Sequence, residues 1–212
     1  MNLFQSYLSQ SSSVTFRIRL ATTLLITFTM VSGCEVADPQ KEEVPELITT
    51  VTLTFIPTSG EDPVRVSATD PDGEGVQDIM VEGPVRLVAS KSYTLQVSLI
   101  NGLADPTQPE YDVTEEVEEE AEEHIIFFSW TNNLFVSPMG DGNVDNRSDQ
   151  VNYEDEDANG LPLGLETLWT TAGINTGELR IVLKHQPDLK SETSDSSTGE
   201  TDVDITFPII VE

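Results

Sequence analysis

The stretch TTVTLTF, residues 49–55, alternates threonine with large apolar side chains and decides the fold class of the chain. Val51, Leu53 and Phe55 share one face and the threonines share the other, which is the period-two pattern of a half-buried strand. Comparable apolar runs follow in VRVSA (64–68), YTLQVSL (93–99), HIIFFSW (124–130), LFVS (134–137), LETLWTT (165–171), ELRIVLKH (178–185) and VDITFPIIV (203–211). Because turn signals such as DPDGEG and DANG separate these runs, we predict about eight strands. The fold class that this pattern predicts is mainly β, an antiparallel immunoglobulin-like β-sandwich with one short acidic helix.

The helical candidate is the stretch TEEVEEEAEEHIIFF (114–128), in which seven glutamates fall within nine residues before the chain turns apolar. Asp112 and Glu115 have the spacing of a capping box, and the early glutamates suit the positive end of the helix dipole. Val113 and Val117 lie four residues apart and start a thin apolar stripe. We predict a short helix that crosses from one sheet to the other.

The N-terminus has the pattern of a lipoprotein signal peptide. Residues 1–33 contain no acidic residue and run apolar from Leu20 to Val31, which is too short to span a bilayer, before the small-residue site VSGC (31–34). We therefore predict cleavage after residue 33 and lipidation of Cys34, the single cysteine; the alternative is an ordinary thiol, which would have no partner within the chain. Residues 34–47 carry charge and two prolines and are predicted to form a flexible tether before a sandwich domain at 48–212.

The chain is strongly acidic, with a formal net charge of -28. Removal of residues 1–33 takes away two of the ten basic residues and none of the thirty-eight acidic ones, so the mature chain carries 8 minus 38, or -30. Such a charge repels nucleic acid and anionic surfaces, and it attracts metal cations or basic partners. We therefore expect no nucleic acid among its partners, and attachment to the membrane through Cys34.

One candidate metal site combines Glu120 and His124, which stand four residues apart and would reach one zinc or copper ion from the same face of the predicted helix. His185, at the end of the run ELRIVLKH, is a possible third ligand. The alternative interpretation is a solvated acidic face with a histidine near the end of the helix.

A second candidate is a calcium site in the segment DEDANGLPLGLE (155–166). Asp155, Asp157, Asn159 and Glu166 occupy positions one, three, five and twelve of the calcium-loop pattern, with glycine at position six. The context differs from an EF-hand, because a proline stands at position eight and the following residues have the pattern of a strand. The alternative is a hairpin whose turn uses Asn159 and the glycine after it.

The sequence gives little support to catalysis. It lacks a Gly-x-Ser-x-Gly elbow, a phosphate-binding glycine loop and a His-Glu-x-x-His pair, and its single cysteine lies at the predicted cleavage site. Trp130 and Trp169 are expected in strands, either as core aromatics or lining a ligand surface. We predict a protein that is not an enzyme.

Several segments together resemble a group of uncharacterised outer-membrane lipoproteins of Gram-negative bacteria, often found beside TonB-dependent receptors. These segments are PELITTVTLTFIPTSG, DVTEEVEEEAEEHIIFF, DEDANGLPLGLE, GELRIVLKHQP and GETDVDITFPIIVE. The resemblance implies a lipid anchor in the outer membrane, on its periplasmic or cell-surface face, and a partner in nutrient capture.

Two functions follow from these patterns as hypotheses. The first is a non-enzymatic, lipid-anchored protein of the cell envelope that captures a metal cation or cationic ligand beside a TonB-dependent receptor. The second is a structural or adhesive surface module with no specific small ligand. An envelope hydrolase that uses paired carboxylates fits the sequence less well.

Overall fold

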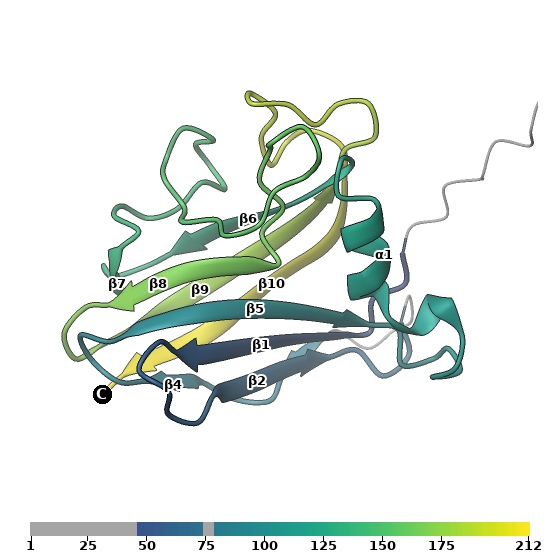
Figure 1. Cartoon of the computed structure of the whole chain (residues 1–212). Coiled ribbons are helices and arrows are strands. Elements are labelled where there is room, and N and C mark those ends of the chain that lie inside the picture. Colours follow the sequence, from purple (N-terminus) through teal and green to yellow (C-terminus); the bar gives the residue numbers. More distant parts are fainter. Residues whose placement is uncertain (1–45, 74–78) are drawn as a thin grey trace, which may run out of the picture. The chain divides into compact units, whose positions relative to one another are not determined.

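Two β-sheets face each other across an apolar core (Figure 1). The structure is a computed structural model and describes residues 46–73 and 79–212. The larger sheet has the strand order β3 (Met80–Val81), β2 (Val64–Thr69), β1 (Thr50–Pro57), β5 (Ser92–Ile100), β8 (Glu166–Thr171) and β7 (Phe135–Ser137). The smaller sheet has the order β4 (Val85–Leu87), β10 (Glu200–Val211), β9 (Asn175–His185) and β6 (His124–Trp130). The pairings are antiparallel except that of β4 with β10, which is parallel.

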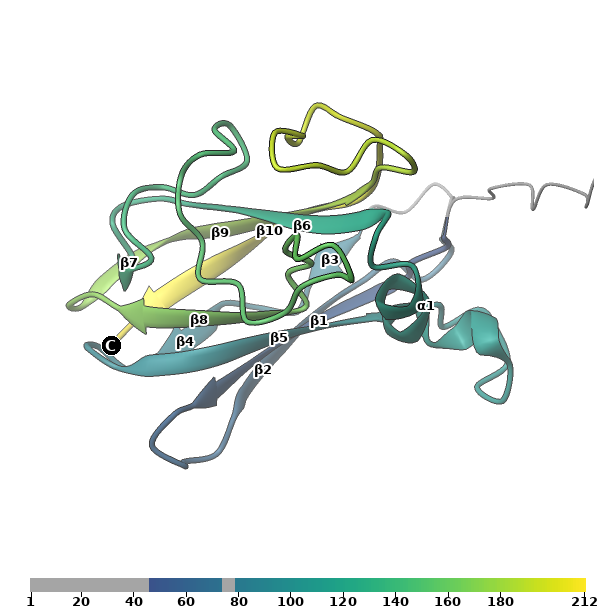
Figure 2. The same ribbon diagram turned by 45° about the horizontal axis from the view of Figure 1, so that its top comes forward.

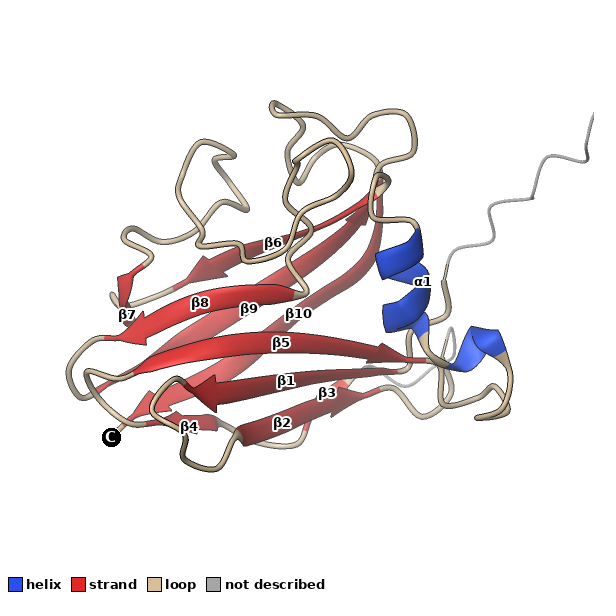
Figure 3. Cartoon of the chain, in the orientation of Figure 1, coloured by secondary structure: helices blue, strands red, loops and turns tan. Residues whose placement is uncertain are grey.

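The predicted β-sandwich with one short helix is confirmed, and Figure 3 shows how strands dominate the described chain. Each of the eight predicted runs forms a strand. Two further strands, β3 and β4, were not predicted, because they contain only two and three residues. A period of two cannot be recognised over so short a run.

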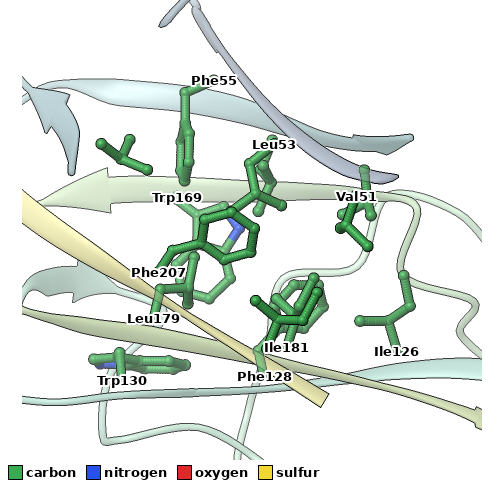
Figure 4. Packing of buried hydrophobic residues seen from close by; sticks show 14 of the residues in the cluster. Val51, Leu53, Phe55, Ile126, Phe128, Trp130, Trp169, Leu179, Ile181 and Phe207 are labelled. Carbon is green, nitrogen blue, oxygen red and sulfur yellow. The ribbon is translucent and has the colours of Figure 1, made fainter. Parts of the chain in front are cut away.

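Aromatic side chains fill the centre of the sandwich (Figure 4). The Trp169 ring meets the Trp130 ring nearly edge-on at 5.1 Å between centroids, and the Phe128 and Phe135 rings lie 5.5 and 4.6 Å from Trp169. Edge-to-face contacts of this kind stabilise an aromatic core beyond the area that they bury. Both tryptophans are buried, so the core interpretation is correct and neither lines an exposed surface.

The strand HIIFFSW is apolar on both faces because both of its faces are covered. Ile126 and Phe128 point into the main core, whereas Ile125 and Phe127 form a second cluster with Val182 and Val144 outside the smaller sheet. The loops that follow β7 and β9 lie on this outer side (Figure 2). This covering explains why β6 lacks the alternation of the other strands.

The helix α1 (Val113–Glu119) connects β5 of the larger sheet to β6 of the smaller one, as predicted, and a short 3₁₀ turn, η1 (Pro109–Tyr111), precedes it. The predicted capping box is wrong, because Asp112 makes no side-chain capping hydrogen bond. Instead the Thr114 hydroxyl accepts from the Leu99 amide of β5 at 2.9 Å and donates to the Leu99 carbonyl at 3.1 Å. These bonds fasten the helix to the sheet that it leaves.

The predicted signal peptide, Cys34 and all but the last two residues of the predicted tether lie outside the described residues. Those last two residues, Glu46 and Leu47, are described, and the Glu46 side chain is only 6% exposed. The folded part therefore begins at least two residues earlier than residue 48. Among the described residues, no helix has the length and apolar character needed to cross a membrane.

Candidate metal centre

Two histidines end the apolar core where α1 crosses between the sheets. His124 is the first residue of β6 and His185 is the last residue of β9, and the two are direct partners in the antiparallel register. They lie two residues from Ile126 and Leu183, which point into the core, so alternation places both histidines on the same inner face. Their rings stack at 4.7 Å between centroids with planes 9° apart.

The two nitrogens of His124 have different partners. Nδ1 lies 3.1 Å from the carbonyl oxygen of Glu120, which only accepts, so Nδ1 carries a hydrogen and donates it. Nε2 lies 3.2 Å from Oε1 of Glu46, in an ion pair that lacks the geometry of a hydrogen bond. In neutral His124 this Nε2 bears a lone pair, and the carboxylate oxygen bears others. Two such atoms at this distance require a positive species beside them, either a proton on the imidazole or a metal ion.

The electrostatics of the metal-free pair are those of an imidazolium and a carboxylate. Burial opposes the charged form of His124, but the nearby Glu46 carboxylate outweighs it and raises the pKa of His124 above its ordinary value. Burial likewise opposes ionisation of Glu46, and His124 lowers the pKa of that carboxyl below its ordinary value. The His124 side chain is fully buried and that of Glu46 is 6% exposed, so solvent screens this charge pair only weakly.

The acidic run that follows Thr114 has two sides. The side chains that face solvent are Glu115, Glu118, Glu119 and Glu122, and those that are partly buried are Glu116, Glu120 and Glu123. The solvated-face interpretation is therefore right for four of the seven glutamates. The other three lie on the side of the histidines.

The expected geometry of Glu120 and His124 on one helix face is wrong. The helix ends at Glu119, and His124 belongs to a strand. The backbone carbonyl of Glu120 contacts His124, whereas its side chain is grouped with those of Glu123 and His185. Glu123 Oε2 lies 3.2 Å from Nε2 of His185, so Glu123 has the position beside this ring that Glu120 was expected to hold beside His124.

Three sets of side chains bring their potential ligand atoms within 4.8 Å of one another: Glu46, His124 and His185; Glu120, Glu123 and His185; and Glu46, Glu116 and Glu120. The first set is the most deeply buried and has two nitrogen donors. With metal–ligand bonds of about 2.1 Å, two ligands of a tetrahedral zinc ion lie about 3.4 Å apart. The 3.2 Å between Nε2 of His124 and Oε1 of Glu46 matches that spacing.

The predicted calcium loop forms the alternative structure, a turn closed by its own backbone. Asp155 accepts from the amides of Gly164 and Glu166 at 2.7 and 2.8 Å. Asp157 Oδ1 accepts from the amides of Asn159 and Leu161, and Gly160, with φ of +78°, makes the turn that was expected of it.

Two further carboxylate oxygens of that loop also have partners within the protein. Oδ2 of Asp157 forms an ion pair with the Lys190 ammonium at 2.9 Å, and Glu166, at the start of β8, accepts from Gln96 at 3.1 Å. A lysine ammonium beside a carboxylate occupies the place that a cation would take. No three side chains of this loop form one of the candidate ligand groups among the described residues. The segment 155–166 therefore has the turn of the alternative interpretation, and calcium binding there stays a prediction.

Sequence reasoning missed three residues of the candidate ligand groups, Glu46, Glu116 and Glu123. Glu46 was placed in the tether, and no local pattern marks it, because its position beside His124 depends on how the segment before β1 packs. Glu123 was one of many glutamates in the run, and only the turn from α1 into β6 directs it to His185. The cluster as a whole depends on the register between β6 and β9, which the sequence does not specify.

Comparison of the chain with models of known protein families, with characterised proteins and with solved structures gave no match.

Proposed function

We propose that the chain is a lipid-anchored, non-enzymatic protein of the outer membrane that captures a divalent transition-metal cation at Glu46, His124 and His185. The observation that supports this most is the buried pair of potential ligand atoms, Nε2 of His124 and Oε1 of Glu46, 3.2 Å apart. An imidazole whose other nitrogen donates to a backbone carbonyl is oriented as metal-binding histidines are. A metal ion would take the place of the proton that holds the metal-free pair together.

The surroundings favour a cation over other ligands. Glu116, Glu120 and Glu123 add three partly buried carboxylates beside the histidines. The net charge of -28 attracts cations to the whole molecule and speeds their encounter with it. These features support capture of a cation from dilute solution, which is a function that needs no catalytic group.

The proposed location rests on the sequence. The site VSGC ending at Cys34 supports a lipid anchor, and the resemblance to lipoproteins found beside TonB-dependent receptors supports a role next to such a receptor. A captured metal would then be passed to the receptor or held near it. The second hypothesis, a structural or adhesive surface module, would assign the histidine–carboxylate cluster to folding alone.

The test is a zinc titration of the purified full chain after metal has been removed, followed by calorimetry and by thermal melting. We expect one tight site and a raised melting temperature, since a ligand that binds only the folded state stabilises it. His185→Gln is expected to weaken zinc binding at least tenfold. His124→Ala is expected to abolish it, although the loss of a fully buried side chain will also lower stability.

The matched control is Glu118→Gln, because Glu118 is exposed on the same acidic run and belongs to none of the candidate ligand groups. A specific site predicts that this variant binds zinc like the parent at 0.5 M salt, where surface charges are largely screened. Zinc heats that vanish at that salt concentration, or that fall equally in Glu118→Gln and His185→Gln, would refute capture at the histidines. The structural module would then be the better hypothesis.

A further inference from the structure

His185 belongs to two of the candidate ligand groups and therefore joins them. One group adds Glu46 and His124 to it, and we call this group the inner position. The other adds Glu120 and Glu123, and we call it the outer position. Within each group the ligand atoms lie within 4.8 Å of one another. Nε2 of His185 lies 3.2 Å from Oε2 of Glu123, so the shared imidazole contacts a carboxylate of the outer position directly.

The exposed fraction of these side chains rises from the inner position to the outer one. It is 0% for His124 and 6% for Glu46, which belong to the inner position. It is 9% for the shared His185 and 41% for Glu123. A cation that arrives from solvent therefore meets the outer position first.

The turn between α1 and β6 holds Glu123 beside the shared histidine. The Glu123 carbonyl accepts from the amide of Gln186, the residue after His185, at 2.6 Å. In the same turn the Ala121 carbonyl accepts from the Lys190 ammonium, also at 2.6 Å. These bonds fix the backbone on both sides of the turn, so the outer carboxylate has its place beside the imidazole without a metal ion.

The inner position has the stronger donors for a zinc-like cation. It supplies two imidazoles, whereas the outer position supplies one, and zinc and similar cations favour imidazole nitrogen. Two buried atoms of the inner position, Nε2 of His124 and Oε2 of Glu46, make no hydrogen bond with any described residue. Buried polar atoms without such partners are uncommon, and these two favour a ligand that binds both.

We propose that a zinc-like divalent cation enters through the outer position, with Glu123 as its entry ligand, and passes to the inner position while it stays bound to His185. This proposal rests on the proposed function and adds the route by which the cation reaches its site. Direct transfer of an ion from water into a buried site would remove its hydration in one step, which is costly. Exchange of one ligand at a time keeps the ion coordinated throughout. Glu123 releases the ion once Glu46 and His124 bind it.

The test measures the association and dissociation rate constants of zinc by stopped-flow mixing with a chromophoric chelator. The full chain, stripped of metal, is compared with Glu123→Gln at 0.5 M salt, where surface charges are largely screened. Glutamine keeps the size of the side chain and removes its charge. A residue that acts only on the route changes the barrier equally in both directions, so its loss slows both steps by one factor. We expect both rate constants to fall by about tenfold, the lower end of the effect for a residue that contacts a metal ligand, while the dissociation constant changes far less.

The matched control is Glu118→Gln, because Glu118 is exposed on the same acidic run and lies outside the candidate ligand groups. Its two rate constants are expected to equal those of the parent. Parental rates in Glu123→Gln, or equal slowing in both variants, would overturn the entry route while capture at the histidines stands. Faster dissociation with unchanged association in Glu123→Gln would also overturn it, because Glu123 would then stabilise the final complex. Absence of zinc binding by the parent itself would overturn both proposals.

Discussion

Replacement of Lys190 by methionine is expected to destabilise the protein strongly, because it leaves a buried carboxylate without its cation. The Lys190 side chain is 2% exposed and its ion-pair partner, the Asp157 side chain, is 0% exposed. The same ammonium donates to the carbonyl of Ala121 at 2.6 Å, in the turn between α1 and β6. Lys190 therefore ties the loop after β9 to the loop before β8 and to the turn that leads to His124.

The size of the effect follows from the burial of the pair. Removal of one partner of a buried ion pair costs about 3 to 5 kcal/mol, because the other charge stays buried and unpaired. For a domain of this size each kcal/mol lowers the melting temperature by about 2 to 4 °C, so we expect a decrease of about 6 to 20 °C. Burial opposes ionisation of Asp157, but Lys190 outweighs it and lowers the pKa of Asp157.

The destabilisation caused by Lys190→Met is expected to depend on pH. Burial opposes ionisation of Asp157 more than any other single influence, so without Lys190 we expect the pKa of Asp157 in the folded variant to lie above its unfolded value. The folded variant then binds a proton more tightly than the unfolded chain, and its stability falls as the pH rises through that raised pKa. The destabilisation by Lys190→Met is therefore expected to be largest at pH 7 and to shrink toward pH 4.

Thermal melting at both pH values, in the presence of a chelator, measures this effect. The matched control is Lys91→Met, because Lys91 pairs with Glu61 at the surface, where the Glu61 side chain is 54% exposed. Such a surface pair contributes at most about 1 kcal/mol. A melting temperature of Lys190→Met within about 3 °C of the parent at pH 7, or equal losses in the two variants, would refute the reasoning.

Two other perturbations test the fold and the site. At Gly142 (φ +103°) a Cβ would lie 2.1 Å from the Phe128 carbonyl oxygen, whereas at Gly140 (φ +98°) it would meet nothing within 4 Å. In urea unfolding, Gly142→Ala should therefore cost about 3 kcal/mol or more, and Gly140→Ala only about 1 to 2 kcal/mol of backbone strain; equal losses would contradict this. In metal-free protein the raised pKa of Asp202, about 6, means that its carboxyl supports folding below about pH 4 and loses that contribution as the pH rises through 6. Asp202→Asn should therefore be as stable as the parent at pH 4. At pH 7 it should be more stable by on the order of 1 to 2 kcal/mol, after allowance for solvent screening. The same excess of stability at both pH values would contradict this prediction.

The sequence predicted the strands well because each long strand repeats its signal. In β1 and β10 an apolar residue recurs at every second position on the buried face, so both were identified as strands. Strand β6 was identified from its apolar run alone, and the structure shows that both of its faces are covered. The helix was also expected, but its last residue was not, because glutamates continue past Glu119 without a stop signal.

The candidate site was predicted only in part. His124 and His185 were both singled out, and the structure brings them together as partners across two strands. The expected link between Glu120 and His124 was wrong because it assumed a helix where the chain had already turned into β6. The position of Glu46 depends on the packing of the segment before β1, and this feature has no signal in the residues themselves.

His124 and His185 stand at strand positions that would ordinarily hold apolar side chains. His124 and His185 occupy inner-face positions that continue the rows of Ile126 and Leu183, where an apolar side chain would lengthen the core at no electrostatic cost. The chain instead buries a histidine there and pairs it with Glu46, close to a bulge in β10. Each of these choices departs from the local rule for a strand, and departures of this kind concentrate at functional sites. Replacement of a buried ion pair by apolar side chains is often neutral or stabilising, so the cluster is more readily explained by the proposed binding of a cation than by folding alone.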